Sequence, residues 1–192
     1  MSKSDPAEIF REVIGWAQAI HPGPVVLIGG AVRDVLMGTE PAERDLFYLG
    51  AKLAELQGGF ARFAERKPRP FRRHAALAAE VPAWFGLAQV FASSCTTAAE
   101  ILEETDWNIS AFGFDGEILA GERLENIGPG RRLRLLKVSN PIFTLARGFD
   151  FSKRFNMRFD TADVVALCQA VASGDFKPPR RRRLTRRGLA RR

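Results

Sequence analysis

The segment between Val25 and Gly50 constrains the fold more than any other part of the chain. It reads VVLIGGAVRDVLMGTEPAERDLFYLG: an apolar β-branched run, two glycines, a short helical stretch ended by Gly38, and a second apolar run. Continuous apolar runs of this kind are typical of strands buried in the middle of a sheet. The segment therefore predicts a strand, a tight turn, a helix over 31–37 and another strand, an order found in α/β proteins.

The paired glycines, Gly29 and Gly30, suit a phosphate group. A turn without Cβ atoms lets backbone N–H groups approach a ligand, and the helix that follows directs its positive end toward it. Tight packing alone is the other reason for a glycine pair at this place. Glu43 and Asp45 lie two residues apart on the next predicted strand, so they project to the same side. Paired carboxylates beside a phosphate-binding turn predict an Mg²⁺ site formed by these two residues.

The remaining elements follow from periodicity, capping residues and glycines. Asp5 and Pro6 predict the start of a helix that ends at HPGP, and a helix from Ala51 is expected to break at Gly58. The basic, proline-broken segment 66–74 is predicted to be an exposed loop or an irregular edge. Further predictions are a strand over 84–92, a helix over 96–104 capped by Thr96 or Thr97, a strand and hairpin over 106–119, and helices over 140–155 and 161–174, the last capped by Thr161 or Asp163.

Length and composition predict one globular unit with a small appendage, because 46% of the 192 residues are hydrophobic. The two cysteines, Cys95 and Cys168, lie far apart and have no Cys or His nearby, which disfavours a zinc site or a disulfide framework. The N-terminal residues MSKSDPAEIF lack an apolar signal core, and no apolar run reaches the roughly 18 residues of a membrane span. We therefore expect a cytoplasmic protein.

Charge is distributed unevenly along the chain. The net charge is +7, but nine of the 29 basic residues lie between Lys177 and Arg192, where there is no acidic residue. This tail is expected to be disordered until it binds a partner. Nucleic acid, bound through backbone phosphates, is the predicted partner, and an acidic protein surface or a larger ribonucleoprotein is the alternative. The predicted nucleic-acid-binding residues are Arg72, Arg73, Arg180, Arg181, Arg182, Arg183, Arg186, Arg187, Arg191 and Arg192.

Three motifs resemble those of the tRNA nucleotidyltransferases (CCA-adding enzymes) and bacterial poly(A) polymerases. The run GGAVRDVLMGTEPAERD is similar to the family's GGxVRD motif followed by a DxD pair. Residues 105–118, TDWNISAFGFDGEI, are similar to RRDFTINAMAYD, and residues 147–159, RGFDFSKRFNMRF, to the helix RAIRFAARLGF that begins the family's neck. The resemblance covers most of the chain between Val25 and Phe159.

The resemblance implies a nucleotidyltransferase fold of α+β type, a mixed sheet flanked by helices. It places a triphosphate of ATP or CTP on Gly29 and Gly30, and Mg²⁺ on Glu43 and Asp45, for transfer of a nucleotide to an RNA 3′ end. Asp106 would lie near the nucleotide. The pair Arg33 and Asp34 matches the family and is expected either to orient phosphate or to brace the turn.

The chain departs from the family pattern at several functional positions. Glu43 replaces the first Asp of DxD, Arg44 stands between the pair, and Gln89 stands where a later strand of the family carries Glu. Arginines of the second and third motifs are replaced by Glu104, Thr105 and Asp150. Two hypotheses therefore remain open: an active RNA-directed nucleotidyltransferase, and a non-catalytic subunit that uses the same fold as a scaffold.

The predicted organisation has three parts: a nucleotidyltransferase-like head over 1–137, a helical neck-like extension over 138–176 and the Arg-rich tail over 177–192. Family members continue into further domains that grip tRNA, which makes autonomous CCA addition by this chain unexpected. A partner subunit that supplies such domains is one possibility that the sequence leaves open.

Overall fold

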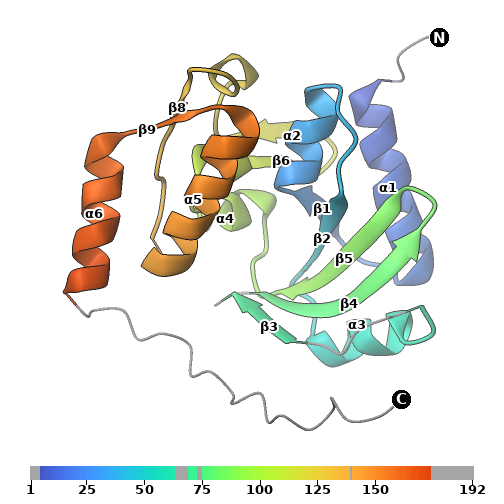
Figure 1. Cartoon of the computed structure of the whole chain (residues 1–192). Helices are drawn as coiled ribbons and strands as arrows, with labels where there is room; N and C mark the ends of the chain where they lie inside the picture. Colours follow the sequence, from blue (N-terminus) through green and yellow to red (C-terminus); the bar gives the residue numbers. More distant parts are fainter. Residues whose placement is uncertain (1–4, 64–68, 73–74, 139, 174–192) are drawn as a thin grey trace, which may run out of the picture.

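The computed structural model describes residues 5–63, 69–72, 75–138 and 140–173 (Figure 1). Its centre is a mixed sheet of seven strands, in the spatial order β3-β4-β5-β2-β1-β6-β7. The bounds of these strands are β1 (Val25–Ile28), β2 (Glu43–Leu49), β3 (Arg69–Arg72), β4 (Ala75–Ala83), β5 (Gly86–Ser93), β6 (Phe112–Phe114) and β7 (Ile118–Ala120). Only the β2–β5 pair is parallel; the other neighbours in this sheet are antiparallel. The predicted mixed sheet flanked by helices is confirmed.

Helices cover both faces of the sheet. Their bounds are α1 (Pro6–Ile20), α2 (Gly30–Leu36), α3 (Leu53–Phe60), α4 (Ala98–Leu102), α5 (Pro141–Phe155) and α6 (Thr161–Ala172), with short 3₁₀ turns η1 (Asn108–Ser110) and η2 (Leu124–Asn126). The larger core joins α1, α2 and α3 to one face, through residues such as Phe10, Leu46 and Phe60. The smaller core joins α4 to the opposite face, around Phe47 and Phe91. None of the described helices is long and apolar enough to cross a membrane.

The chain's α5 and α6 pack side by side beyond the sheet (Figure 1). A short parallel pair of strands, β8 (Arg132–Leu133) and β9 (Arg158–Phe159), lies next to them. The indole of Trp107, fully buried, donates a hydrogen bond of 2.8 Å to the carbonyl oxygen of Thr144 in α5. This contact and the apolar surface around it fix α5 against η1. The predicted boundary between residues 137 and 138 stays a prediction, and the tail over 177–192 lies outside the described residues.

Several local predictions were wrong, each because tertiary packing overrode a local signal. The α3 helix passes through Gly58 and Gly59 to Phe60, whose ring is fully buried, and Gly59 is packed against His21. Strand β4 was not predicted, because its alanine-rich sequence has Val81 as its only β-branched residue. The prediction of an irregular edge for the basic segment over 66–74 is confirmed, because its residues 69–72 form the edge strand β3, with an irregular register. The stretch over 108–110 is a 3₁₀ turn instead of a strand, and α6 is capped by Asp160.

We expect Gly148→Ala to destabilise the protein by about 1–3 kcal/mol, because there is no space for a methyl group between α5 and its neighbours. A Cβ at this position would lie 2.5 Å from Cζ2 of Trp107 and 2.8 Å from Cε1 of Phe159. Urea unfolding measures the change. Gly15→Ala in α1 is the matched control, since nothing lies within 4 Å of its Cβ position, and it is expected to stabilise slightly. Equal stability of the two variants would contradict the packing at Gly148.

The carboxylate of Glu122 connects the end of the β6–β7 hairpin to η1, η2 and β8. It is buried, and burial raises its pKa, but this is outweighed by hydrogen bonds from Asn126 (2.7 Å), Asn108 (3.1 Å), Arg134 and the backbone of Arg123. The net result is a pKa lowered to about 2.

Because the folded pKa of Glu122 lies below its unfolded value of 4.5, its ionised form stabilises the protein above that pH, and this contribution is lost as the pH falls toward about 2. We expect Glu122→Gln to cost about 2 kcal/mol at pH 7, with solvent screening allowed for, and progressively less below pH ~4. Unfolding curves at a series of pH values measure this. The exposed Glu117 provides the control, Glu117→Gln, which is expected to change the stability at pH 7 by less than about 0.5 kcal/mol.

Candidate active site

The register of β1 against β2 places the glycine turn beside the first carboxylates of β2. Ile28, the last residue of β1, is opposite Asp45 in this antiparallel pair. The glycine turn that follows Ile28 therefore begins beside Asp45. A Cβ built on Gly29 would lie 3.7 Å from Oδ2 of Asp45. Gly29 has φ +89° and ψ −139°, a conformation that L side chains rarely adopt, which explains why a glycine is needed at this position.

Alternation along β2 separates the carboxylates from the arginine between them. Glu43 and Asp45 lie on the face of the smaller core, the same side as Phe47, whereas Arg44 lies on the opposite face. Arg44 is buried, donates to the carbonyl oxygen of Phe85, and forms an ion pair of 2.9 Å with Glu40. The arginine that interrupts the acidic pair is therefore a packing residue that does not neutralise it.

A polar row crosses the sheet on the carboxylate side. Asp45 is opposite Gln89 in the parallel pair with β5, and Gln89 is opposite Glu80 in the antiparallel pair with β4. The side-chain amide of Gln89 donates to Oε2 of Glu43 at 3.0 Å and to Oε1 of Glu80 at 3.1 Å. Glu80, which is 3% exposed, is a third carboxylate near the site that the sequence analysis did not identify.

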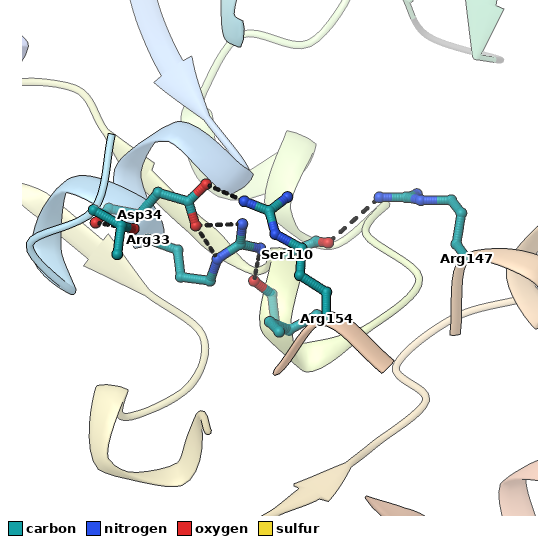
Figure 2. A network of polar contacts seen from close by, with 7 residues as sticks. Arg33, Asp34, Ser110, Arg147 and Arg154 are labelled. Atoms are coloured by element: carbon teal, nitrogen blue, oxygen red, sulfur yellow. Dashed lines mark hydrogen bonds and ion pairs between the residues drawn. The ribbon is translucent and has the colours of Figure 1, made fainter. Parts of the chain in front are cut away.

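Two arginines from α5 complete the site, seven residues apart and therefore on one face of the helix. Figure 2 shows Arg154 directed toward Asp34, at 3.2 Å, and Arg147 directed toward Ser110, at 3.4 Å. Arg147 also binds both carboxylate oxygens of Asp106, at 2.9 and 2.8 Å. Both arginine side chains retain solvent access, 38% for Arg147 and 56% for Arg154. They can therefore exchange a protein carboxylate for an anionic ligand.

Arg33 and Asp34 form an internal brace (Figure 2). Arg33 is 2% exposed, donates to Oδ1 of Asp34 at 2.7 and 2.5 Å, and donates to the carbonyl oxygen of Ile109 at 3.1 Å. Its guanidinium lies 4.6 Å from the ring centre of Phe155. Burial lowers the pKa of Arg33, and the neighbouring Asp34 opposes this shift. Of the two roles expected for this pair, the geometry matches the brace that holds α2 against η1 and α5.

One cavity of about 150 Å³ gathers residues from the glycine turn, α2, β2, η1 and α5. The residues that line it are Gly30, Ala31, Arg33, Asp34, Ala42, Glu43, Asp45, Ser110, Arg147, Phe151 and Arg154. The lining thus holds both carboxylates and both exchangeable arginines. Gly29 lies next to Asp45, but its N–H donates to the carbonyl oxygen of Phe112 at 2.7 Å, so this group is already used within the sheet.

The donor set fits a magnesium ion that is shared with a nucleotide. Within the described ranges, no group of three or more His, Cys, Asp and Glu side chains forms a ready metal site. Mg²⁺ does not require one, because it is commonly held by one or two carboxylates together with substrate phosphates and water. Glu43 and Asp45 supply two such carboxylates at one side of the cavity.

Comparison with solved structures agrees with this architecture. A CCA-adding enzyme in complex with ATP matches 90% of this chain, with 21% sequence identity and a TM-score of 0.61. The chain has the nucleotidyltransferase fold. The Thermotoga maritima CCA-adding enzyme complexed with tRNA gives the same identity, coverage and TM-score, and a tRNA-processing enzyme in an apo form matches 91% of the chain, with 22% identity and a TM-score of 0.58.

The chain spans less than half the length of these nucleotidyltransferase-fold structures: 44% of the two CCA-adding enzymes and 49% of the tRNA-processing enzyme. No protein-family model matches the sequence, and no curated protein matches it either. The likeness between these proteins thus lies in the fold.

The structure brings together the residues predicted for the nucleotide and metal site, but not those predicted to bind nucleic acid. One cavity is lined by Gly30, Arg33, Asp34, Glu43 and Asp45. Gly29 lies beside Asp45, and Asp106 accepts hydrogen bonds from Arg147. For Arg72 only the backbone, in β3, is described, and Arg73 and all the tail arginines lie outside the described residues. The sequence analysis missed Glu80, Ser110, Arg147, Phe151 and Arg154 as site residues. For the two α5 arginines, the seven-residue spacing and the match to arginines of RAIRFAARLGF were signals that could have indicated them.

Proposed function

We propose that this protein binds a nucleoside triphosphate with Mg²⁺ in the cavity beside Gly30 and transfers the nucleotide to an RNA 3′ end. One observation carries the proposal: two carboxylates from β2, the glycine turn and two exchangeable arginines from α5 line the same cavity. Negative ligands for a metal ion and positive ligands for phosphate oxygens thus line one site. A site that only braces the fold does not need solvent-accessible groups of both signs.

In this proposal, one set of side chains binds the metal ion and another set binds the phosphate groups. Glu43 and Asp45 would hold Mg²⁺, which supplies charge neutralisation at the phosphates and lowers the pKa of a bound hydroxyl. Arg147 and Arg154 would exchange Asp106 and Asp34 for phosphate oxygens, because a guanidinium binds phosphate through two parallel hydrogen bonds. The brace formed by Arg33 keeps α2 and α5 at the spacing that this exchange requires.

RNA and nucleotide partners are supported by the structural neighbours. The CCA-adding enzymes among them are complexes with ATP, with CTP and with tRNA. We propose the same classes of ligand for this chain, with a partner subunit supplying additional RNA contacts if the cavity alone binds RNA weakly.

The test is incorporation of labelled ATP or CTP into short RNA in the presence of Mg²⁺. The proposal expects extension of the 3′ end that EDTA abolishes. A protein that neither extends RNA nor binds ATP or CTP with Mg²⁺ in calorimetry would exclude the proposed function.

Three observations favour a second candidate, a non-catalytic scaffold. The cavity of about 150 Å³ is smaller than the roughly 300–1,000 Å³ typical of small-molecule sites. Arg147 and Arg154 already have carboxylate partners, and the Gly29 N–H is already hydrogen-bonded. In this candidate the Arg-rich tail docks onto nucleic acid or an acidic partner. Deletion of residues 177–192 would then abolish RNA binding in a protein that shows no affinity for nucleotide.

A further inference from the structure

Gln89 is placed between two carboxylates on the face of the sheet that carries the candidate metal ligands. Its amide nitrogen lies 3.0 Å from Oε2 of Glu43 and 3.1 Å from Oε1 of Glu80. An amide NH₂ group has two hydrogens, so it can donate to both carboxylates at once. Hydrogen bonds to ionised acceptors are stronger than neutral ones, which makes this bridge an effective constraint on both side chains.

The two bridged carboxylates differ in how much they can move. Glu80 is 3% exposed and its backbone is paired with Gln89 of β5, so it has little freedom. Glu43 is exposed at the start of β2 and has three rotatable side-chain bonds, so holding it in one rotamer costs conformational entropy. Gln89 therefore connects a fixed carboxylate to a mobile one that the proposed chemistry needs in a defined place.

We propose that Glu80 and Gln89 are positioning residues that hold Glu43 in its metal-binding orientation. Gln89 engages Oε2 of Glu43, which leaves the carboxylate's other oxygen for the metal ion, and Glu80 holds the amide of Gln89 in turn. The inference rests on the proposed function, because it assigns a role toward Mg²⁺ at the same site. It assigns neither Glu80 nor Gln89 as a metal ligand.

A neutral residue at position 89 is consistent with this arrangement. Asp45, Glu43 and Glu80 all lie on the same face around Gln89, so a carboxylate there would place a fourth negative charge among three. The amide instead donates to two of them. The longer side chain of Glu43, compared with an Asp, reaches the Gln89 amide on the neighbouring strand.

The test is a double-mutant cycle on metal affinity with Glu80→Gln, Gln89→Met and the double variant. Titration of Mn²⁺ into the full chain with ATP, followed by calorimetry, gives a readout that does not depend on turnover. Residues that orient a metal ligand typically contribute 10- to 100-fold to metal affinity, so Gln89→Met is expected to weaken Mn²⁺ binding about tenfold or more. If Glu80 acts only through Gln89, Glu80→Gln weakens binding in the wild-type background and adds nothing to Gln89→Met.

The possible outcomes separate the two proposals. Additive losses would show that Glu80 acts on the metal directly and would overturn the inference, as would unchanged Mn²⁺ affinity in Gln89→Met. Wild-type protein that does not bind Mn²⁺ with ATP would overturn the proposed function, and the inference with it. Thermal unfolding in EDTA checks that the variants fold, and Glu117→Gln on the exposed hairpin provides a carboxylate control with unchanged affinity. If Glu80→Gln does not fold, the Gln89→Met result alone decides.

Discussion

Replacing Asp45 by Asn is expected to lower the rate of nucleotide incorporation into RNA on the order of 100- to 1,000-fold, the usual cost of removing one group that stabilises charge in a transition state. Asn has the shape of Asp but lacks the negative charge that a magnesium ion requires. Asp45 is the carboxylate next to the glycine turn, with Oδ2 near Gly29, so no other β2 residue can replace it. The measurement is the initial rate of labelled ATP or CTP incorporation at saturating Mg²⁺.

The matched control for this substitution is Asp115→Asn. Asp115 is exposed in the β6–β7 hairpin, away from the cavity, so its replacement should leave the rate within about twofold of wild type. Calorimetry with ATP and Mg²⁺ should show weakened binding for Asp45→Asn and unchanged binding for the control. Full activity of Asp45→Asn would contradict the assignment of the metal site.

Replacing Arg33 by Met is expected to destabilise the protein by about 3–5 kcal/mol, because it leaves the buried carboxylate of Asp34 without its closest cation. In a chain of this size that corresponds to a fall of roughly 10 °C in melting temperature. The variant also loses the hydrogen bond to Ile109 and the contact with Phe155. Thermal unfolding and urea titration both measure the effect.

A second substitution distinguishes the loss of an ion pair from general damage to α2. The double variant Arg33→Met with Asp34→Leu removes both charges, and we expect it to regain at least half of the lost stability, since the buried unpaired charge is gone. Arg123→Met is the control, because its ion pair with Glu125 is exposed and should contribute less than about 1 kcal/mol. A double variant as unstable as the single one would show that the packing of Arg33, and not its charge, holds α2.

The central part of the fold could be predicted from local sequence. The apolar runs around Leu27 and Phe47 can bury their side chains only as strands with helices on both faces. The glycine pair between the two runs forces a tight turn. The caps of α1, α4 and α5 are formed by Asp5, Thr97 and Asn140, each of which accepts a backbone N–H. Strand β4 could not be predicted in this way, because its alanines favour a helix and pairing with β3 and β5 keeps them extended.

The candidate site also has some features that local sequence predicts and others that depend on tertiary contacts. Alternation along β2 is a local property, so the common direction of Glu43 and Asp45 was predictable from their spacing. The role of Arg44 was not, because its partners Phe85 and Glu40 are brought to it by the β4–β5 turn and the loop before β2. Gln89 and Glu80 likewise reach Glu43 only through the lateral order of the strands.

The sequence by itself determined the strand–turn–helix–strand unit, the shared face of its two carboxylates and the concentration of positive charge in the tail. These are properties of neighbouring residues, set by backbone geometry and composition. Only the tertiary structure decided which polar side chains meet at and near the cavity: Arg154 with Asp34, Arg147 with Asp106, and Gln89 between Glu43 and Glu80. The physical reason is that these contacts join residues on different elements, and such pairs are fixed by strand register and by the packing of α5, which the order of residues along the chain does not specify.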